Sequence, residues 1–152
     1  MKITDQDRQL LGVVQREVDL SLADLSERVG MAPSTVWRKL QDLTAAGVIS
    51  KKVALLSPQL LDVKLLVLAS VSLEDHMEAT VEGFVKTVRA QPEILECLKV
   101  TGGFDYILKV RVSDVEAYET FMTHQLLRSP YVRSVQSTFV LKEVKATTEL
   151  PL

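Results

Sequence analysis

The residues that start and end helices in the first third of the chain constrain its fold more than any other feature. Ser21 with Asp24 is typical of a helix start, because both side chains can accept hydrogen bonds from free backbone amides. Gly30 is typical of a helix end, and Pro33 suits the first turn of a new helix. Gly47 ends that new helix. The pattern predicts two short helices joined by a tight turn.

The apolar residues of the second of these helices recur at spacings of four and three, as one buried helix face requires: Val36, Leu40 and Leu43. An earlier helix is predicted as well, because Thr4 with Asp7 is a candidate capping box and apolar residues follow to about Val18. Residues 48–56 are predicted to form a pair of short strands, or wing. Together these elements make residues 1–52 a winged helix-turn-helix domain.

The rest of the chain alternates between strand-like and helix-like patterns. Strands are predicted from runs of β-branched and other apolar residues at 63–73, 94–100, 104–112 and 132–144. Helices are predicted between them, each opened by a capping pair: Asp75 with Glu78, and Ser113 with Glu116. This order of elements is the ferredoxin-like βαββαβ arrangement. The predicted class is therefore α+β, with a linker at residues 53–62 and a ferredoxin-like sandwich domain at residues 63–152.

A helix-turn-helix places its second helix in the major groove of DNA, where hydrogen-bonding side chains distinguish base edges. Arg38 is the strongest candidate for such a contact, and Lys51 and Lys52 on the wing would neutralise phosphates. For Trp37 we expect packing against the first helix or the linker rather than DNA contact, because large aromatics are usually mostly buried. The full set of candidate DNA-binding residues is Pro33, Ser34, Thr35, Trp37, Arg38, Lys39, Gln41, Lys51 and Lys52.

The charge balance fits a small DNA reader but not a protein that coats nucleic acid. The chain has 18 Lys and Arg against 20 Asp and Glu, a net charge of −2, and a local basic patch is sufficient for a reader. The lone Cys97 excludes an internal disulfide, no apolar run is long enough to cross a bilayer, and the first residues lack a secretory pattern. A cytoplasmic location without membrane contact is expected.

Longer stretches of the sequence resemble a known family. Residues 22–43 and Gly47-Val48-Ile49 resemble the helix-turn-helix of the Lrp/AsnC (leucine-responsive/asparagine-synthase, feast/famine) transcriptional regulators. Residues 92–106 and 139–152 resemble the second domain of that family, called RAM. The resemblance covers nearly the whole chain in the right order. Ala32 departs from the family, which commonly has a helix-capping serine at that position.

The resemblance implies a sequence-specific regulator that binds double-stranded promoter DNA as a homodimer, often assembled further into an octamer of four dimers. It also implies that an amino acid binds between dimers and changes assembly or DNA affinity. In the family this site lies at a turn of one subunit and the final strand of its neighbour. The corresponding effector-binding residues here are Thr101, Gly102, Gly103, Phe104, Asp105, Tyr106, Gln136, Ser137 and Thr138.

The turn itself has chemistry suited to an amino acid. Glycines at 102 and 103 let a ligand approach the backbone, and their amides can cradle a carboxylate. Asp105 can bind an ammonium group through a charge-assisted hydrogen bond. The alternative is an ordinary tight turn, because a Gly-Gly pair between strands needs no ligand and an aspartate often satisfies turn amides.

No catalytic, metal-binding or cofactor pattern is found. Cys97 is expected to be a small buried hydrophobe, and His76 and His124 are expected to lie apart on the surface. Phosphate-loop and dinucleotide-binding fingerprints are missing, so we predict no enzyme, no metal and no cofactor besides the effector. Two alternatives stay open: a ligand-binding or assembly module that lacks DNA affinity, and a small enzyme on a ferredoxin-like fold.

Self-association follows from the predicted sheet. One layer of helices can cover only one face of the sheet, and the strands predicted at 63–73 and 132–144 are long for so small a domain. The other face should therefore be buried in a partner, which predicts a homodimer or larger assembly.

Overall fold

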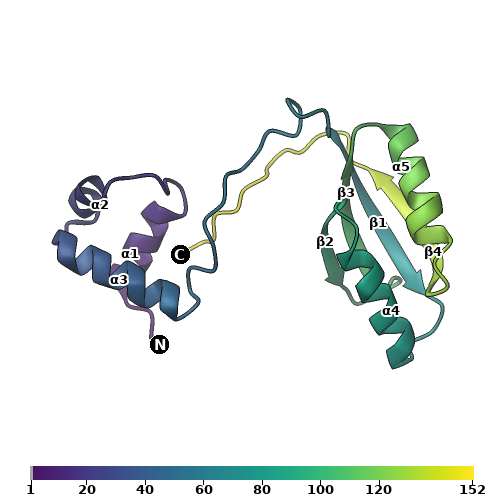
Figure 1. The fold of residues 1–152 in the computed structure, drawn as a ribbon, viewed down its shortest axis with the longest axis horizontal. Coiled ribbons are helices and arrows are strands. Elements are labelled where there is room, and N and C mark those ends of the chain that lie inside the picture. The colour runs from purple at the N-terminus through teal and green to yellow at the C-terminus, as the bar shows by residue number, and fades with distance from the viewer. Residues whose placement is uncertain (1) are drawn as a thin grey trace. The chain divides into compact units, whose positions relative to one another are not determined.

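The computed structural model describes residues 2–152 and divides into two compact units (Figure 1). The helical unit comprises Met1–Leu55 together with Lys145–Leu152, and the sheet unit comprises Leu56–Val144. This division differs from the predicted domains, which ended the first domain at residue 52 and assigned the whole C-terminus to the second. The last eight residues group with the helices because they hydrogen-bond to the end of the first helix.

The helical unit contains three helices, α1 (Asp5–Val14), α2 (Leu22–Val29) and α3 (Pro33–Ala45). The predicted capping box of α1 is confirmed: the Thr4 hydroxyl accepts the Asp7 amide, and the Asp7 carboxylate accepts the Thr4 amide at 2.9 Å. α1 ends four residues earlier than predicted. The amide of Arg16 bonds back to the Val13 carbonyl three residues before it, a contact that closes a helix rather than extending it.

The predicted helix-turn-helix is confirmed. The Ser21 hydroxyl accepts the Asp24 amide at the start of α2, and Gly30 closes α2 with a left-handed φ of 63°. Ala32 precedes α3 and offers no side-chain cap, while Pro33 occupies the first turn. The three helices share one small apolar core: Leu10, Leu25, Val29, Val36 and Leu43.

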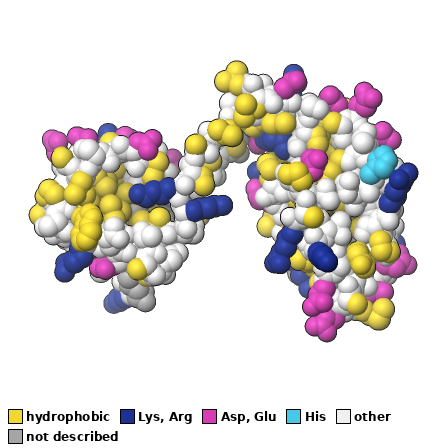
Figure 2. Space-filling model, in the orientation of Figure 1, with side chains coloured by type: hydrophobic (Ala, Val, Ile, Leu, Met, Phe, Trp, Pro, Cys, Tyr) yellow, Lys and Arg dark blue, Asp and Glu magenta, His cyan; other side chains and the backbone are white. Residues whose placement is uncertain are grey.

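The predicted wing strands are wrong. Among the described residues, no strand lies between Val48 and Leu56. Leu55 and Leu56 are each 71% exposed, and Figure 2 shows hydrophobic side chains along this extended segment. Residues 48–56 contain no Gly, Asn, Asp or Pro, the residues that favour the tight turn of a hairpin, and their backbone has no partner strand within the unit.

The sheet unit has the predicted ferredoxin-like order. Its elements are β1 (Leu65–Leu73), α4 (Glu78–Arg89), β2 (Ile94–Lys99), β3 (Tyr106–Val112), α5 (Val115–Phe121) with a π-helical continuation η1 (Met122–Leu127), and β4 (Val132–Phe139). The strands form one antiparallel sheet in the order β2-β3-β1-β4. Alternate residues of β1 and β3 pack with Phe84 and Val88 of α4 and with Tyr118 and Phe121 of α5, so both helices cover one face (Figure 1).

Both predicted capping pairs of this unit need correction. α4 begins after Met77, which makes no side-chain cap, and the Asp75 carboxylate instead accepts the Met77 amide at 2.9 Å. α5 is capped by Asp114 rather than Ser113, through a 2.8 Å hydrogen bond from the amide of Ala117. A carboxylate is a stronger acceptor than a neighbouring hydroxyl, which explains the one-residue difference.

β4 is shorter than predicted. It ends at Phe139, and the amide of Val140 makes its last bond to the carbonyl of Leu66. β1 begins at Leu65, so the chain beyond Val140 has no strand to pair with. The strand pattern continues in the sequence to residue 144, but a strand extends only as far as its neighbour.

Candidate nucleic-acid interface and effector site

α3 presents one polar stripe away from the helical core. Val36 and Leu43 are fully buried, which fixes the rotation of the helix. Four candidate DNA-binding residues are exposed at positions i, i+3, i+4 and i+7, the spacing of a single helix face: Ser34, Trp37, Arg38 and Gln41. Pro33 is also exposed, and Thr35 is half-buried. The stripe combines a cation, two hydrogen-bonding groups and an aromatic ring, as a base-reading helix requires.

Trp37 corrects one expectation. Its side chain is 57% exposed, so it does not pack against α1 or any other part of the helical unit to the degree expected. It lies instead on the same stripe as Arg38. Exposing a large aromatic side chain is unfavourable in water, so an exposed tryptophan among polar residues indicates a contact surface.

Lys39 points into the unit. Its ammonium lies 2.7 Å from the Asp7 carboxylate, and its side chain is only 17% exposed. This hydrogen bond, together with those from Thr4, lowers the pKa of Asp7 from 3.8 to about 2. The pair therefore fastens α3 to α1. No sequence signal indicated it, because the residues are 32 positions apart and Asp7 was already assigned to its local cap.

Lys51 and Lys52 follow α3 in the extended segment and are both exposed. Neither forms an ion pair with an acid within residues 2–152. An extended segment rather than a hairpin carries these two exposed charges.

The candidate effector turn lies between β2 and β3. Gly102 has a φ of 115°, a conformation that side-chain-bearing residues rarely adopt, and Thr101 to Gly103 are exposed. Asp105 ends the turn and anchors it to β1: its amide donates to the Val71 carbonyl at 2.9 Å, and its carboxylate accepts the Leu73 amide at 2.8 Å. Asp105 thus stabilises the turn by hydrogen bonds to the backbone, as an aspartate does in an ordinary tight turn.

The other carboxylate oxygen of Asp105 contacts His76. The His76 Nε2 atom lies 2.7 Å from it, and His76 is itself largely exposed. This contact and the hydrogen bond from the Leu73 amide hold the pKa of Asp105 below its usual value. Both histidines lie on the surface as predicted, but the partner of His76 was missed because the two residues are 29 positions apart.

The aromatic residues of the turn differ in exposure. Tyr106 is buried, and its ring centroid lies 4.9 Å from that of Phe84, so its ring belongs to the core of the sheet unit. Phe104 is half-buried. Of these two aromatic side chains, only Phe104 is partly accessible to a ligand at the turn.

The candidate residues of β4 face opposite sides of the sheet. The Ser137 hydroxyl lies 2.6 Å from that of Tyr118, on the helix-covered face, whereas Gln136 and Thr138 alternate with it. β1 lies between β4 and β3 in the sheet. Within one chain, the turn and the β4 residues are thus not brought together.

The chain is similar to known proteins over nearly its whole length. Sequence profiles match residues 66–150 as an Lrp/AsnC ligand binding domain and residues 3–50 as a winged helix-turn-helix DNA-binding domain. The leucine-responsive regulatory protein of Haemophilus influenzae is 38% identical over 146 residues, covering 96% of this chain and 88% of that protein. The chain belongs to the Lrp/AsnC family. The family resemblance and the α+β class predicted from the sequence are confirmed.

Other Lrp/AsnC relatives support the same assignment. The glutamate uptake regulatory protein of Zymomonas mobilis is 30% identical, with 99% of this chain and 92% of that protein covered. A crystal structure of a Neisseria meningitidis transcriptional regulator in complex with L-methionine superposes with a TM-score of 0.95 at 37% identity, covering 99% and 97% of the two chains. The protein is accordingly a DNA-binding transcriptional regulator of the Lrp/AsnC type and not an enzyme.

Residues 2–152 contain neither a metal-binding cluster nor a membrane-spanning helix. No group of three or more His, Cys, Asp or Glu side chains could hold a metal ion. No helix combines the length and the apolar character needed to cross a membrane.

Proposed function

We propose that the protein binds promoter DNA through the exposed stripe of α3 and adjusts that binding to the level of an amino acid. The stripe of Ser34, Trp37, Arg38 and Gln41 carries this proposal, because its position on α3 leaves it free of the helical core. Arg38 and Gln41 would read base edges, and Ser34 near the helix start would contact phosphate. Lys51 and Lys52 would add affinity without sequence information. We propose that it acts in the cytoplasm, because its relatives are bacterial proteins and bacterial promoter DNA lies there.

An amino acid is the class of effector that the turn favours. Free backbone amides at Gly102 and Gly103 suit a carboxylate, and the Asp105 carboxylate suits an ammonium group. The relatives are named after leucine and glutamate, and one solved neighbour contains L-methionine. These names support an amino acid as the effector and do not favour one amino acid over another. We propose that Gln136 and Thr138 of a neighbouring subunit complete the site, since β1 separates them from the turn within one chain.

Self-association is proposed through the face of the sheet that α4 and α5 leave open. Leu68 is 37% exposed and Leu98 is 53% exposed on this face, with Ile107 paired to Leu98. These side chains would be buried against a second copy, and dimers would assemble further into an octamer. A Leu68→Asp substitution should shift the mass measured by light scattering toward the monomer.

DNA binding can be tested by fluorescence anisotropy with the region upstream of the protein's own gene. Arg38→Ala should weaken binding by about 10- to 100-fold, because a bidentate base contact is worth roughly 1–3 kcal/mol. Arg89→Ala removes the same charge from the end of α4 and should leave affinity unchanged. Equal affinity for random DNA, together with no effect of Arg38→Ala, would favour an assembly module without DNA affinity.

A further inference from the structure

The C-terminal tail is held by the end of α1 through its backbone. Gln15 follows α1, and its side-chain amide forms two hydrogen bonds with Leu150. The Gln15 Nε2 atom donates to the Leu150 carbonyl at 3.1 Å, and the Leu150 amide donates to Gln15 Oε1 at 2.9 Å. This arrangement satisfies both backbone groups of Leu150, much as a neighbouring strand would. It recognises an extended backbone and not a particular side chain.

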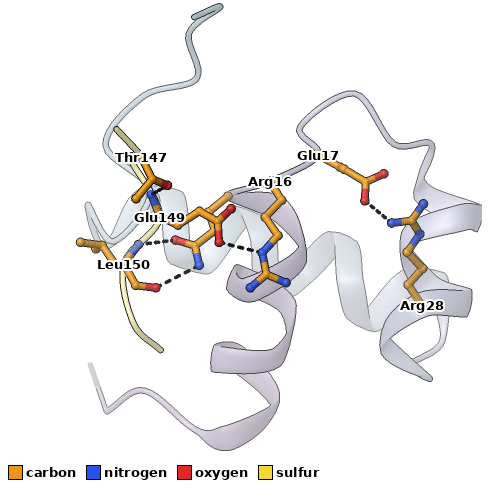
Figure 3. Close-up of polar contacts among 7 residues, drawn as sticks. Arg16, Glu17, Arg28, Thr147, Glu149 and Leu150 are labelled. Carbon is orange, nitrogen blue, oxygen red and sulfur yellow. Dashed lines mark hydrogen bonds and ion pairs between the residues drawn. The ribbon is translucent and has the colours of Figure 1, made fainter. Parts of the chain in front are cut away.

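A neighbouring ion pair fixes the register of this contact. The Arg16 guanidinium donates to the Glu149 carboxylate at 2.8 Å, one residue away from the Gln15 contact on both sides (Figure 3). Glu149 is itself ordered, since its amide donates to the Thr147 hydroxyl at 3.1 Å. If the tail slipped by one residue, Glu149 would move away from Arg16. Charge and backbone pairing therefore select the same alignment.

The surface around these contacts is a groove. It encloses about 750 Å³ and is lined on one side by α1, including Arg8, Gln9 and Gly12, and on the other by the tail. α1 turns Asp7 and Leu10 toward the helical core, so this other side of α1 is not used to hold the three helices together. It is a second surface of the DNA-reading unit.

We propose that this side of α1 is a docking site for an extended peptide, and that its occupant is the tail Lys145–Leu152 of the same chain. The tail follows β4, which carries the candidate effector residues Gln136 to Thr138. The tail is covalently continuous with the sheet unit at residues 144–145, so its docking on α1 gives the helical unit a second, noncovalent link to that unit, in addition to the chain connection at residues 55–56. If the proposed function holds, a change at β4 reaches the DNA-reading helices through this connection.

Docking is tested by hydrogen–deuterium exchange of the C-terminal peptide in the intact protein. Gln15→Ala should speed exchange at the tail at least about threefold, because the Leu150 amide loses its acceptor. Gln6→Ala is the matched control, since Gln6 is an exposed glutamine of α1 that does not line the groove. Exchange at the rate of an unstructured peptide in the unsubstituted protein, or equal rates in both variants, would overturn the proposal.

Charge reversal tests the register. Arg16→Glu alone should speed exchange at the tail, and adding Glu149→Arg should restore most of the protection. Failure of the double variant to restore it would show that the ion pair does not align the tail.

Cross-linking tests whether the tail belongs to the same chain. In an Arg16→Lys variant, a carbodiimide should join the new amine to Glu149, forming an amide with loss of water. The denatured product should keep the mass of one chain, and a doubled mass would assign the tail to a second copy.

The connection to DNA is measured separately. Gln15→Ala should alter the change in DNA affinity that the amino acid causes by at least about threefold, and Gln6→Ala should not. If neither DNA nor amino acid binds to the unsubstituted protein, the proposed function fails, yet the exchange and cross-linking results still decide tail docking. If both bind but Gln15→Ala has no effect on their coupling, the tail docks without transmitting the effector signal.

Discussion

The two units of this protein are stabilised in different ways. The sheet unit is built around a large apolar core that includes Phe84, Tyr106, Tyr118 and Phe121. The helical unit has a small core of five aliphatic residues, and a buried carboxylate, Asp7, links its first and third helices. Small units bury a smaller fraction of their surface, so individual polar contacts contribute a larger share of their stability. The DNA-reading unit is therefore expected to be the less stable and more pH-sensitive of the two.

The chain supplies a separate optical signal for each unit. The only tryptophan, Trp37, lies in the helical unit, and all three tyrosines lie in the sheet unit: Tyr106, Tyr118 and Tyr131. Tryptophan fluorescence and tyrosine near-ultraviolet circular dichroism can thus follow the two unfolding transitions separately.

The largest expected effect is in the core of the sheet unit. Phe84→Ala should lower the free energy of unfolding of this unit by about 4 kcal/mol, because Phe84 is fully buried and its removal leaves a cavity. Urea unfolding followed by tyrosine dichroism measures this loss. Leu141→Ala, at a 99% exposed position, should change it by less than about 0.5 kcal/mol. An equal loss in the tryptophan signal would contradict separate units.

The proposed effector should stabilise the sheet unit selectively. An amino acid at 100 times its dissociation constant adds about 2.7 kcal/mol to the state that binds it. In a thermal-shift screen of the common amino acids, the effector should raise the melting temperature followed by the tyrosine signal and leave that followed by tryptophan nearly unchanged. Asp105→Asn should abolish the shift, since it removes the charge while keeping an acceptor for the Leu73 amide. No shift with any amino acid would identify the turn at Gly102 as structural only.

The helical unit should lose stability in acid before the rest of the protein. The pKa of Asp7 is about 2 in the folded unit and 3.8 as its ordinary value. A lowered carboxyl pKa adds stability that is fully present above about pH 4 and is lost as the pH falls through about 2. Asp7→Ala should lower the free energy of unfolding by about 2 kcal/mol at pH 7, and should remove this pH dependence from the tryptophan transition.

Asp19→Ala is the control for that measurement, because Asp19 is exposed and its carboxylate forms none of the described ion pairs. An acid transition that persists unchanged in Asp7→Ala would refute the role of the Asp7–Lys39 pair.

The smallest expected effect is a gain in the stability of the helical unit. Ala32 leaves the start of α3 without a side-chain cap, so Ala32→Ser should stabilise the helical unit by about 1 kcal/mol. Ser21→Ala, which removes the existing cap of α2, should destabilise it by a similar amount. Tryptophan fluorescence during urea unfolding measures both, and a loss of stability in Ala32→Ser would mean that the added hydroxyl cannot reach the amides of α3.

Sequence patterns were sufficient for most of the helical unit and for the order of elements in the sheet unit. The Thr4–Asp7 capping box, the Ser21 cap and the left-handed Gly30 were all predicted, because each depends on groups no more than four residues apart. The wing strands were predicted wrongly, because a strand needs a partner and residues 48–56 have none within the described chain. For the same reason, β4 ends where β1 stops pairing with it.

Local chemistry along the chain thus determined where helices start, where they end and which face of α3 is apolar. Only the tertiary structure decided that Lys39 turns inward to Asp7, that His76 contacts Asp105, and that Gln15 holds the tail at Leu150. The partners in these pairs are 32, 29 and 135 residues apart. Hydrogen bonds and ion pairs act over a few ångströms, so a distant pair has no signature in the sequence until packing brings its members together.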